Sequence, residues 1–74
     1  MKNDDWRKRV VCDPGIRGGE PCIRGTRIPV SILVASLAEM SIQELLKEYP
    51  HLTHKDIQAA LLYASETAHS TMVV

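Results

Sequence analysis

The residues of this 74-residue chain that are most able to do chemistry are two cysteines, three histidines and a group of arginines. Cys12 and Cys22 have no histidine near them in the sequence, so neither has the adjacent base that a nucleophilic thiol requires. His51 and His54 stand three residues apart across a predicted helix start, without the further ligands of a metal site. The sequence therefore predicts no catalytic residue, no metal site and no cofactor.

The arginines belong to an uneven distribution of charge, although the formal net charge of the chain is zero. Residues 1–27 hold seven basic and four acidic side chains, whereas residues 28–74 hold two basic and five acidic ones. This division predicts that an anion or an acidic partner meets the N-terminal half. The main candidates for such contacts are Arg17, Arg24 and Arg27.

Turn residues surround these arginines, since all four glycines and two of the four prolines lie between residues 15 and 30. The segment lacks the Lys-Ser/Thr ending of a phosphate-binding P-loop, so its glycines are interpreted as turn residues. Short stretches at residues 9–12 and 21–24 contain β-branched side chains and are bounded by these turns. They predict a small hairpin or a three-stranded patch.

Three helices are predicted from Pro29 onward, where proline stands at the first helical position and its missing N–H costs nothing. Ser41 and Glu44 form a capping box that opens the second helix, and Pro50 ends that helix. Thr53 opens the third helix with a shorter box of the same kind. The apolar stripes of the first and third helices are Val30, Leu33, Val34 and Leu37, and Ile57, Ala60, Leu61 and Ala64.

The second and third predicted helices are separated by so few residues that they must meet at a sharp corner. We therefore predict a mainly α, three-helix domain of the helix-turn-helix or winged-helix-like class, with a small N-terminal β-hairpin. This domain is expected over residues 9–69. A flexible basic arm at residues 1–8 precedes it, and a C-terminal tail at residues 70–74 follows it.

Helix, corner and helix is also the geometry with which many proteins enter the major groove of DNA. The predicted DNA-binding residues are the arginines of the N-terminal half and the start of the third helix, namely Arg17, Arg24, Arg27, His54, Lys55 and Gln58. The third helix suggests a second use, because Leu62 and Tyr63 lie off its apolar stripe. An apolar surface of this kind predicts a partner interface at these two residues.

A longer pattern runs through the chain: residues 18–30 read GGEPCIRGTRIPV, residues 41–53 read SIQELLKEYPHLT and residues 60–64 read ALLYA. The pattern resembles the bacterial family called "domain of unknown function 433", and Met40 departs from it where family members usually carry glycine. The resemblance implies a VapB-type antitoxin that neutralises a PIN-like nuclease toxin and binds its own operator DNA. The resemblance implies no catalytic residue in this chain. The part of the pattern that is most specific to the family includes Thr26 and Arg27. These two side chains are expected to fix the junction between a strand and a helix by forming hydrogen bonds to loop carbonyls.

Two hypotheses about function remain open: an antitoxin-type regulator, or a protein-interaction or dimerisation module that does not bind DNA. A third, an enzyme or metal protein, requires the cysteines or histidines to converge and is disfavoured. A chain this short buries little of its surface, so a homodimer or a complex with another protein is expected. Without a spanning apolar run or a secretory signal, we expect a cytoplasmic protein with no membrane contact and no small-molecule substrate.

Overall fold

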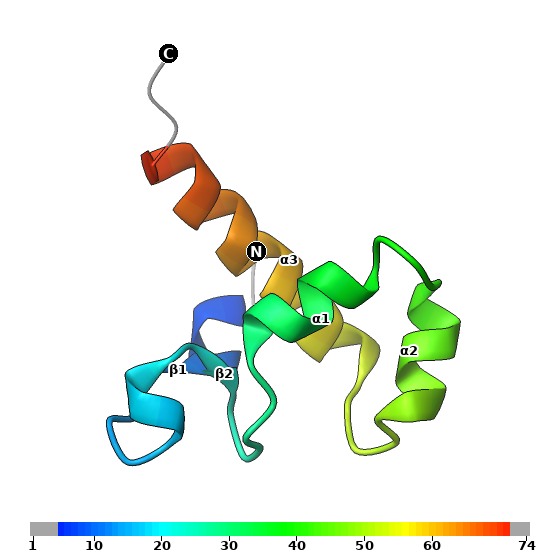
Figure 1. Cartoon of the computed structure of the whole chain (residues 1–74), viewed down its shortest axis with the longest axis horizontal. Helices are drawn as coiled ribbons and strands as arrows, with labels where there is room; N and C mark the ends of the chain where they lie inside the picture. Colours follow the sequence, from blue (N-terminus) through cyan, green and yellow to red (C-terminus); the bar gives the residue numbers. More distant parts are fainter. Residues whose placement is uncertain (1–4, 72–74) are drawn as a thin grey trace.

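The computed structural model describes the backbone of residues 5–71, and the fold within this range is mainly helical (Figure 1). Its elements in chain order, with η marking a 3-10 helix, are η1 (Trp6–Arg9), β1 (Val10–Val11), η2 (Arg17–Gly19), β2 (Cys22–Ile23), α1 (Val30–Ser36), α2 (Ile42–Glu48) and α3 (His54–Thr71). Three α-helices with a small antiparallel sheet near the N-terminus confirm the predicted fold class.

The two strands pair antiparallel, with Val11 opposite Cys22. After β2 the chain reverses at Gly25, whose φ of 80° is a left-handed conformation that glycine adopts without steric cost. The returning segment runs beside β2, because the Ile23 N–H donates a hydrogen bond to the Ile28 carbonyl (3.0 Å) and one isolated bridge follows. The predicted hairpin is thus two short strands with a third stretch held alongside.

Capping residues set the ends of α2 as the sequence predicts. The Ser41 hydroxyl accepts a hydrogen bond from the Glu44 N–H (3.1 Å), and the Glu44 carboxylate accepts one from the Ser41 N–H (2.8 Å). The helix ends at Glu48, two residues before Pro50, which disfavours helical backbone in the residue that precedes it. These local bonds give a seven-residue helix defined limits.

The second capping box opens α3. The Asp56 N–H donates to the Thr53 hydroxyl (3.2 Å), and the Thr53 N–H donates to the Asp56 carboxylate (3.0 Å). Residues 49–53 are all that separate α2 from α3, so the two helices meet at the corner that the sequence predicts. Figure 1 shows α3 crossing beside α1 and then continuing well beyond it.

The core lies where the three helices and β2 converge. Its buried members are Ile23, Val30, Leu33, Leu45, Leu52, Ile57 and Ala60. The predicted stripe of α3 is wrong at Leu61, which is 39% exposed, whereas Ala59, outside the stripe, is fully buried. The reason is that α3 packs against η1 as well as against α1 and α2, so its buried surface is wider than one stripe.

The ends of the predicted domain also differ from the structure. Of the predicted arm at residues 1–8, residues 1–4 lie outside the described range, and the remainder enters η1, which packs against α3. The predicted tail at residues 70–74 begins inside α3, and residues 72–74 lie outside the described range. Within that range, no helix is both long enough and apolar enough to cross a membrane.

Candidate interaction surfaces

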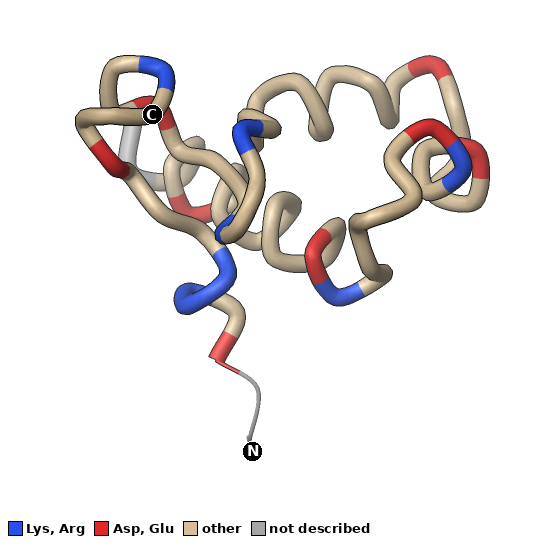
Figure 2. Tube along the Cα trace, turned by 90° about the horizontal axis from the view of Figure 1, so that it is seen from below, with Lys and Arg blue, Asp and Glu red and all other residues tan. Residues whose placement is uncertain are grey.

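Much of the basic charge in the N-terminal half is paired inside the molecule. Arg7 pairs with Glu66 of α3, and the Arg9 guanidinium lies 3.0 Å from a carboxylate oxygen of Asp56, also on α3. Figure 2 shows most of the basic positions in the part of the trace that follows the N-terminus, with acidic positions among them. Part of the uneven charge of the sequence therefore joins the N-terminal segment to α3.

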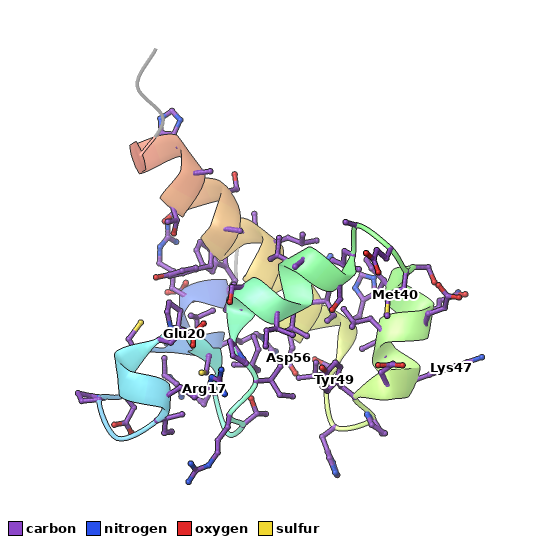
Figure 3. All side chains as sticks on the ribbon, in the orientation of Figure 1. Arg17, Glu20, Met40, Lys47, Tyr49 and Asp56 are labelled. Carbon is purple, nitrogen blue, oxygen red and sulfur yellow. The ribbon has the colours of Figure 1, made fainter. Side chains whose placement is uncertain are left out.

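Arg17, a predicted DNA-binding residue, has a carboxylate beside it. Its Nε lies 3.3 Å from an oxygen of Glu20, and Figure 3 shows the two labelled side chains next to each other. The other oxygen of Glu20 accepts a hydrogen bond from the Ser31 hydroxyl (3.0 Å). Arg17 is exposed, but part of its charge is already balanced within the chain.

Arg24 and Arg27 differ from the other arginines. Both are exposed in the loop between β2 and α1, and no acidic side chain of residues 5–69 lies within ion-pair distance of either guanidinium. The loop is held by Thr26, whose hydroxyl donates to the Ile23 carbonyl (2.7 Å) and accepts from the Ile28 N–H (3.0 Å). The prediction of a bond to a loop carbonyl is therefore confirmed for Thr26 and wrong for Arg27.

The other predicted DNA-binding residues lie at the start of α3, where His54, Lys55 and Gln58 are all exposed. Figure 1 places the turn before α3 and the loop after β2 on the same lower side of the molecule. The structure thus brings the turn that precedes α3 to the same side as the loop that carries Arg24 and Arg27, called the arginine loop below, although the two are far apart in the sequence.

The two predicted interface residues, Leu62 and Tyr63, face different surroundings. Leu62 is 45% exposed and, with Leu61 and Gln58, lines a shallow hollow on the outside of α3. Tyr63 packs against the core and lines a groove between α1 and α3. The two residues that were predicted to form one apolar interface therefore belong to two different surfaces.

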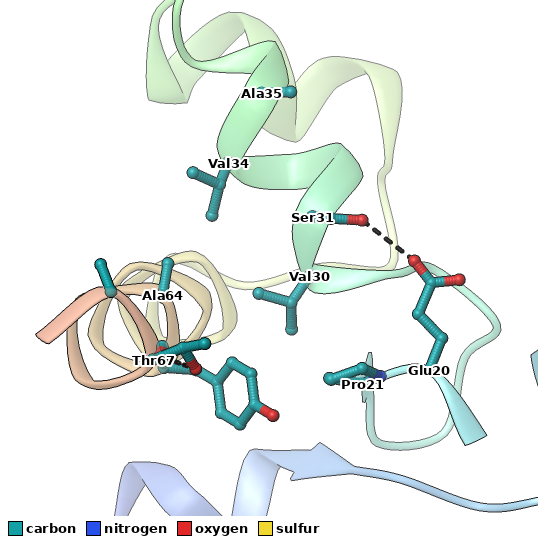
Figure 4. A pocket seen from close by; sticks show the side chains of 10 residues that line it. Glu20, Pro21, Val30, Ser31, Val34, Ala35, Ala64 and Thr67 are labelled. Carbon is teal, nitrogen blue, oxygen red and sulfur yellow. Dashed lines mark hydrogen bonds between the residues drawn. The ribbon is translucent and has the colours of Figure 1, made fainter. Parts of the chain in front are cut away.

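The groove between α1 and α3, called the α1/α3 groove below, has a volume of about 440 Å³ (Figure 4). It is lined by Glu20, Pro21, Val30, Ser31, Val34, Ala35, Tyr63, Ala64, Thr67 and Ala68. Sequence reasoning missed it, although the spacing of four between Ser31 and Ala35, and again between Ala64 and Ala68, is a usable signal. Small residues at this spacing share one face of a helix and leave room beside it.

The two cysteines differ in their surroundings. Cys12 is exposed, Cys22 is buried and both are free thiols. Val11 lies opposite Cys22 in the sheet, and Cys12 follows directly after β1, outside the strand. The part of the chain from residue 5 to residue 71 contains no group of three side chains that could hold a metal ion.

Known proteins place this arrangement in a family. A family model described as "Protein of unknown function (DUF433)" matches residues 10–64, about three quarters of the chain. The chain belongs to the DUF433 family. It is 41% identical over 59 residues to "Uncharacterized protein y4eO" of Sinorhizobium fredii (strain NBRC 101917 / NGR234), which covers 78% of this chain and 27% of that protein.

The fold of this DUF433 chain is also similar to a solved structure. A crystal structure of a DUF433 member protein from Anabaena variabilis ATCC 29413 matches with a TM-score of 0.76 and 40% sequence identity. The match covers 84% of this chain and 62% of that one. The chain thus spans about a quarter of the curated relative's length and less than two thirds of the solved relative's length.

The DUF433 match includes some of these surfaces completely and others in part. The arginine loop, the start of α3 and the exposed leucines all lie within residues 10–64. Arg7, Glu66 and the groove residues Thr67 and Ala68 lie outside the matched range. The contacts of η1 and of the second half of α3 therefore have to be argued from this chain itself.

Proposed function

We propose that this DUF433 chain is a non-catalytic regulator that binds a partner protein, as an antitoxin binds a PIN-like nuclease toxin. The observation that supports this proposal is the exposed pair of leucines, Leu61 and Leu62, on the outer side of α3. The family resemblance implies the antitoxin role and hence the class of partner. The proposed protein acts in the cytoplasm, where such a toxin would act.

The surroundings of the leucine pair suit a protein contact. Leu61 and Leu62 are 39% and 45% exposed, and Gln58 completes the hollow that they line. Protein interfaces commonly have a few apolar anchors at the centre and polar side chains around them. Complete burial of a leucine contributes about 1.5–3 kcal/mol, so covering this pair would favour binding substantially.

Co-expression with a PIN-like nuclease encoded beside the chain tests this proposal. The wild type is expected to co-purify with the nuclease and to inhibit its cleavage of RNA. Leu62→Glu is expected to weaken binding by about 100-fold, because a carboxylate replaces an interface anchor. The control is Ile32→Glu on α1, where the replaced side chain is 42% exposed and therefore comparable. A toxin that ignores the wild type, or binds both variants equally, contradicts the proposal.

Operator binding is a second candidate function, and the arginine loop favours it. Arg24 and Arg27 are exposed, and no carboxylate of residues 5–69 pairs with either guanidinium. Thr26 holds the loop between them in a defined shape. Unpaired arginines on a fixed loop are suited to phosphate contacts, which position a protein on DNA without reading its sequence.

Fluorescence anisotropy with the upstream DNA, measured as a function of salt, tests operator binding. A dimer with two arginines per chain neutralises about four phosphates, so the log–log slope is expected to be about −3.6. Replacing Arg24 and Arg27 together by alanine should abolish most of this slope. Arg17→Ala should change it less, because Glu20 already pairs with Arg17. A slope near zero for the wild type contradicts operator binding and leaves the toxin proposal standing.

A further inference from the structure

The arginine loop is the tip of a hairpin formed by β2 and the segment that returns beside it. The Ile23 N–H donates to the Ile28 carbonyl (3.0 Å), and the Val30 N–H donates to the Pro21 carbonyl (2.9 Å), so the two sides of the hairpin run antiparallel. Residues 24–27 join these two sides. Figure 1 shows the tip at the lower edge of the molecule, below the three α-helices. A ligand can therefore reach the tip without displacing any part of the core.

Backbone N–H groups of the tip alternate between those that are bonded within the chain and those that are not. The N–H groups of Arg24, Thr26 and Ile28 each donate to another group of the chain, at distances between 2.8 and 3.0 Å. Between them, the N–H groups of Gly25 and Arg27 donate to no group among the described residues. A backbone N–H is a strong donor that is normally satisfied. These two donors are thus available to a ligand in place of water.

The surface beside these two N–H groups is open, and its lining carries no negative charge. A hollow of about 410 Å³ adjoins the tip and is lined by Ile16, Gly25, Thr26 and Arg27, none of which is acidic. Gly25 has no side chain, and a Cβ added there would meet no other atom within 4 Å. A ligand can therefore approach the backbone of the tip directly.

Positive charge at the same place favours an anion. Arg24 and Arg27 are the first and last residues of the tip, both are exposed, and neither guanidinium pairs with a carboxylate of residues 5–69. Two like charges on so short a tip repel each other, and a bound anion removes that repulsion. The hollow has no aromatic lining for the base stacking that single-stranded nucleic acid uses. The chemistry of the tip therefore matches the backbone phosphates of duplex DNA.

We infer that the tip of the arginine loop is a phosphate-binding site to which the protein backbone contributes as well as the side chains. The N–H groups of Gly25 and Arg27 donate to the oxygens of a phosphodiester, while the guanidinium groups of Arg24 and Arg27 neutralise its charge and that of a neighbouring phosphate. Backbone N–H groups and arginines are both common phosphate contacts. This inference rests on the operator binding proposed above, and it adds Gly25 as a binding residue that carries no charge.

The missing charge of the Gly25 contact separates this inference from binding by the arginines alone. Loss of a charged contact reduces the dependence of binding on salt, because fewer counterions are released from the DNA. Loss of an uncharged N–H donor weakens binding at every salt concentration but leaves that dependence unchanged.

An ester bond in place of the Gly25 amide tests the contact. The full chain, made by total chemical synthesis with glycolic acid at position 25, lacks this one N–H group and keeps every side chain. Its affinity for the upstream duplex, measured by fluorescence anisotropy, is expected to fall by about 10-fold with an unchanged log–log slope against salt. The matched control is the same ester at Gly18, another glycine with a positive φ (66°) that does not line the hollow. The control should bind like the wild type.

Amide resonances of the isotope-labelled wild type give a second measurement that does not depend on a variant. On addition of the duplex, the resonances of Gly25 and Arg27 should move more than those of Arg24 and Thr26, whose N–H groups are bonded internally. Inorganic phosphate at constant ionic strength should move the same resonances only at a far higher phosphate concentration.

The outcomes distinguish the site from the proposed function. An ester at Gly25 that binds like the wild type, or resonances that inorganic phosphate saturates before the duplex does, would overturn the inference and leave operator binding standing. A wild type that binds the duplex at no salt concentration would overturn both.

Discussion

Asp56 connects two parts of the chain that are distant in the sequence. One carboxylate oxygen pairs with Arg9 at the end of η1, and the other accepts the Thr53 N–H at the start of α3. The side chain of Asp56 is only 13% exposed, so water weakens these interactions little. By contrast, Arg7 and Glu66 form a pair in which both side chains are largely exposed.

This difference predicts unequal effects of removing the two carboxylates. Asp56→Ala is expected to lower the free energy of unfolding by about 2–3 kcal/mol, because it removes a helix cap and leaves Arg9 without this partner. Glu66→Ala is expected to cost less than about 1 kcal/mol, as is typical of exposed ion pairs. Urea denaturation of the two variants measures both values, and equal losses would contradict the assignment.

The buried thiol of Cys22 makes stability depend on pH. Burial raises its pKa, the charge of Glu20 raises this pKa further, and Arg17 acts in the opposite direction. In the unfolded chain the thiol ionises near its ordinary pKa of about 8.5. The folded protein keeps the proton to higher pH, so this contribution is complete below that value and is lost as the pH rises through the folded pKa.

The free energy of unfolding is therefore expected to fall more steeply above about pH 8.5 in the wild type than in Cys22→Ala. The comparison uses the slope against pH, because the substitution also changes packing at neutral pH. Cys12→Ala is the comparison variant: Cys12 is exposed and is the weakest of the groups that raise the pKa of Cys22, so its loss should change the slope much less than the loss of Cys22. Parallel slopes for all three proteins would show that Cys22 is not the group responsible.

At the level of elements, the loop between β2 and α1 combines a rigid backbone with exposed charge. Gly25 permits the reversal of the chain, and the Thr26 hydroxyl bridges the two sides of the loop by donating to one backbone group and accepting from another. Arg24 and Arg27 precede and follow Thr26 in the chain, and both side chains are exposed. The loop therefore fixes where two positive charges lie without using their side chains for its own structure.

Thr26→Val tests this arrangement, because valine has almost the same shape but cannot form either hydrogen bond. The substitution is expected to cost about 2 kcal/mol and to lower the Tm by about 10 °C. Thr26→Ser keeps the hydroxyl and is expected to lose less than half as much. Thermal unfolding followed by circular dichroism measures both, and a valine variant as stable as the wild type would contradict a structural role for the hydroxyl.

On the scale of the whole molecule, η1 acts as a third layer on α3. Helix α3 contacts α1 and α2 through the core, and η1 covers a further part of the surface of α3. Arg7 and Arg9 bring positive charge to Glu66 and Asp56, so the basic N-terminal half and the acidic C-terminal half attract each other. The division of charge, which in the sequence predicts an external partner, is partly used to assemble the domain.

Deleting residues 1–9 is accordingly expected to destabilise the domain by about 3 kcal/mol, because it uncovers α3 and leaves Asp56 without Arg9. Lys8→Ala is the control, since Lys8 is exposed and forms no ion pair among the described residues. Urea denaturation gives both free energies. A truncated chain with the stability of the full chain would mean that η1 contributes nothing to the fold.

The features that the sequence alone determined are those that depend on residues a few positions apart. The capping boxes at Ser41 and Thr53, the helix end before Pro50 and the turn at Gly25 each arise from backbone and side-chain preferences within four or five residues. For this reason the number of α-helices, the corner between α2 and α3 and the small sheet were all predictable.

Only the tertiary structure decided which side chains meet across long separations. Arg7 and Glu66 are 59 positions apart, and Arg9 and Asp56 are 47 apart, so no local pattern pairs them. The exposure of Leu61 and the existence of the α1/α3 groove likewise depend on how α3 is packed between η1 and α1. Helical periodicity defines which residues share a face, but the neighbouring elements determine which face is buried.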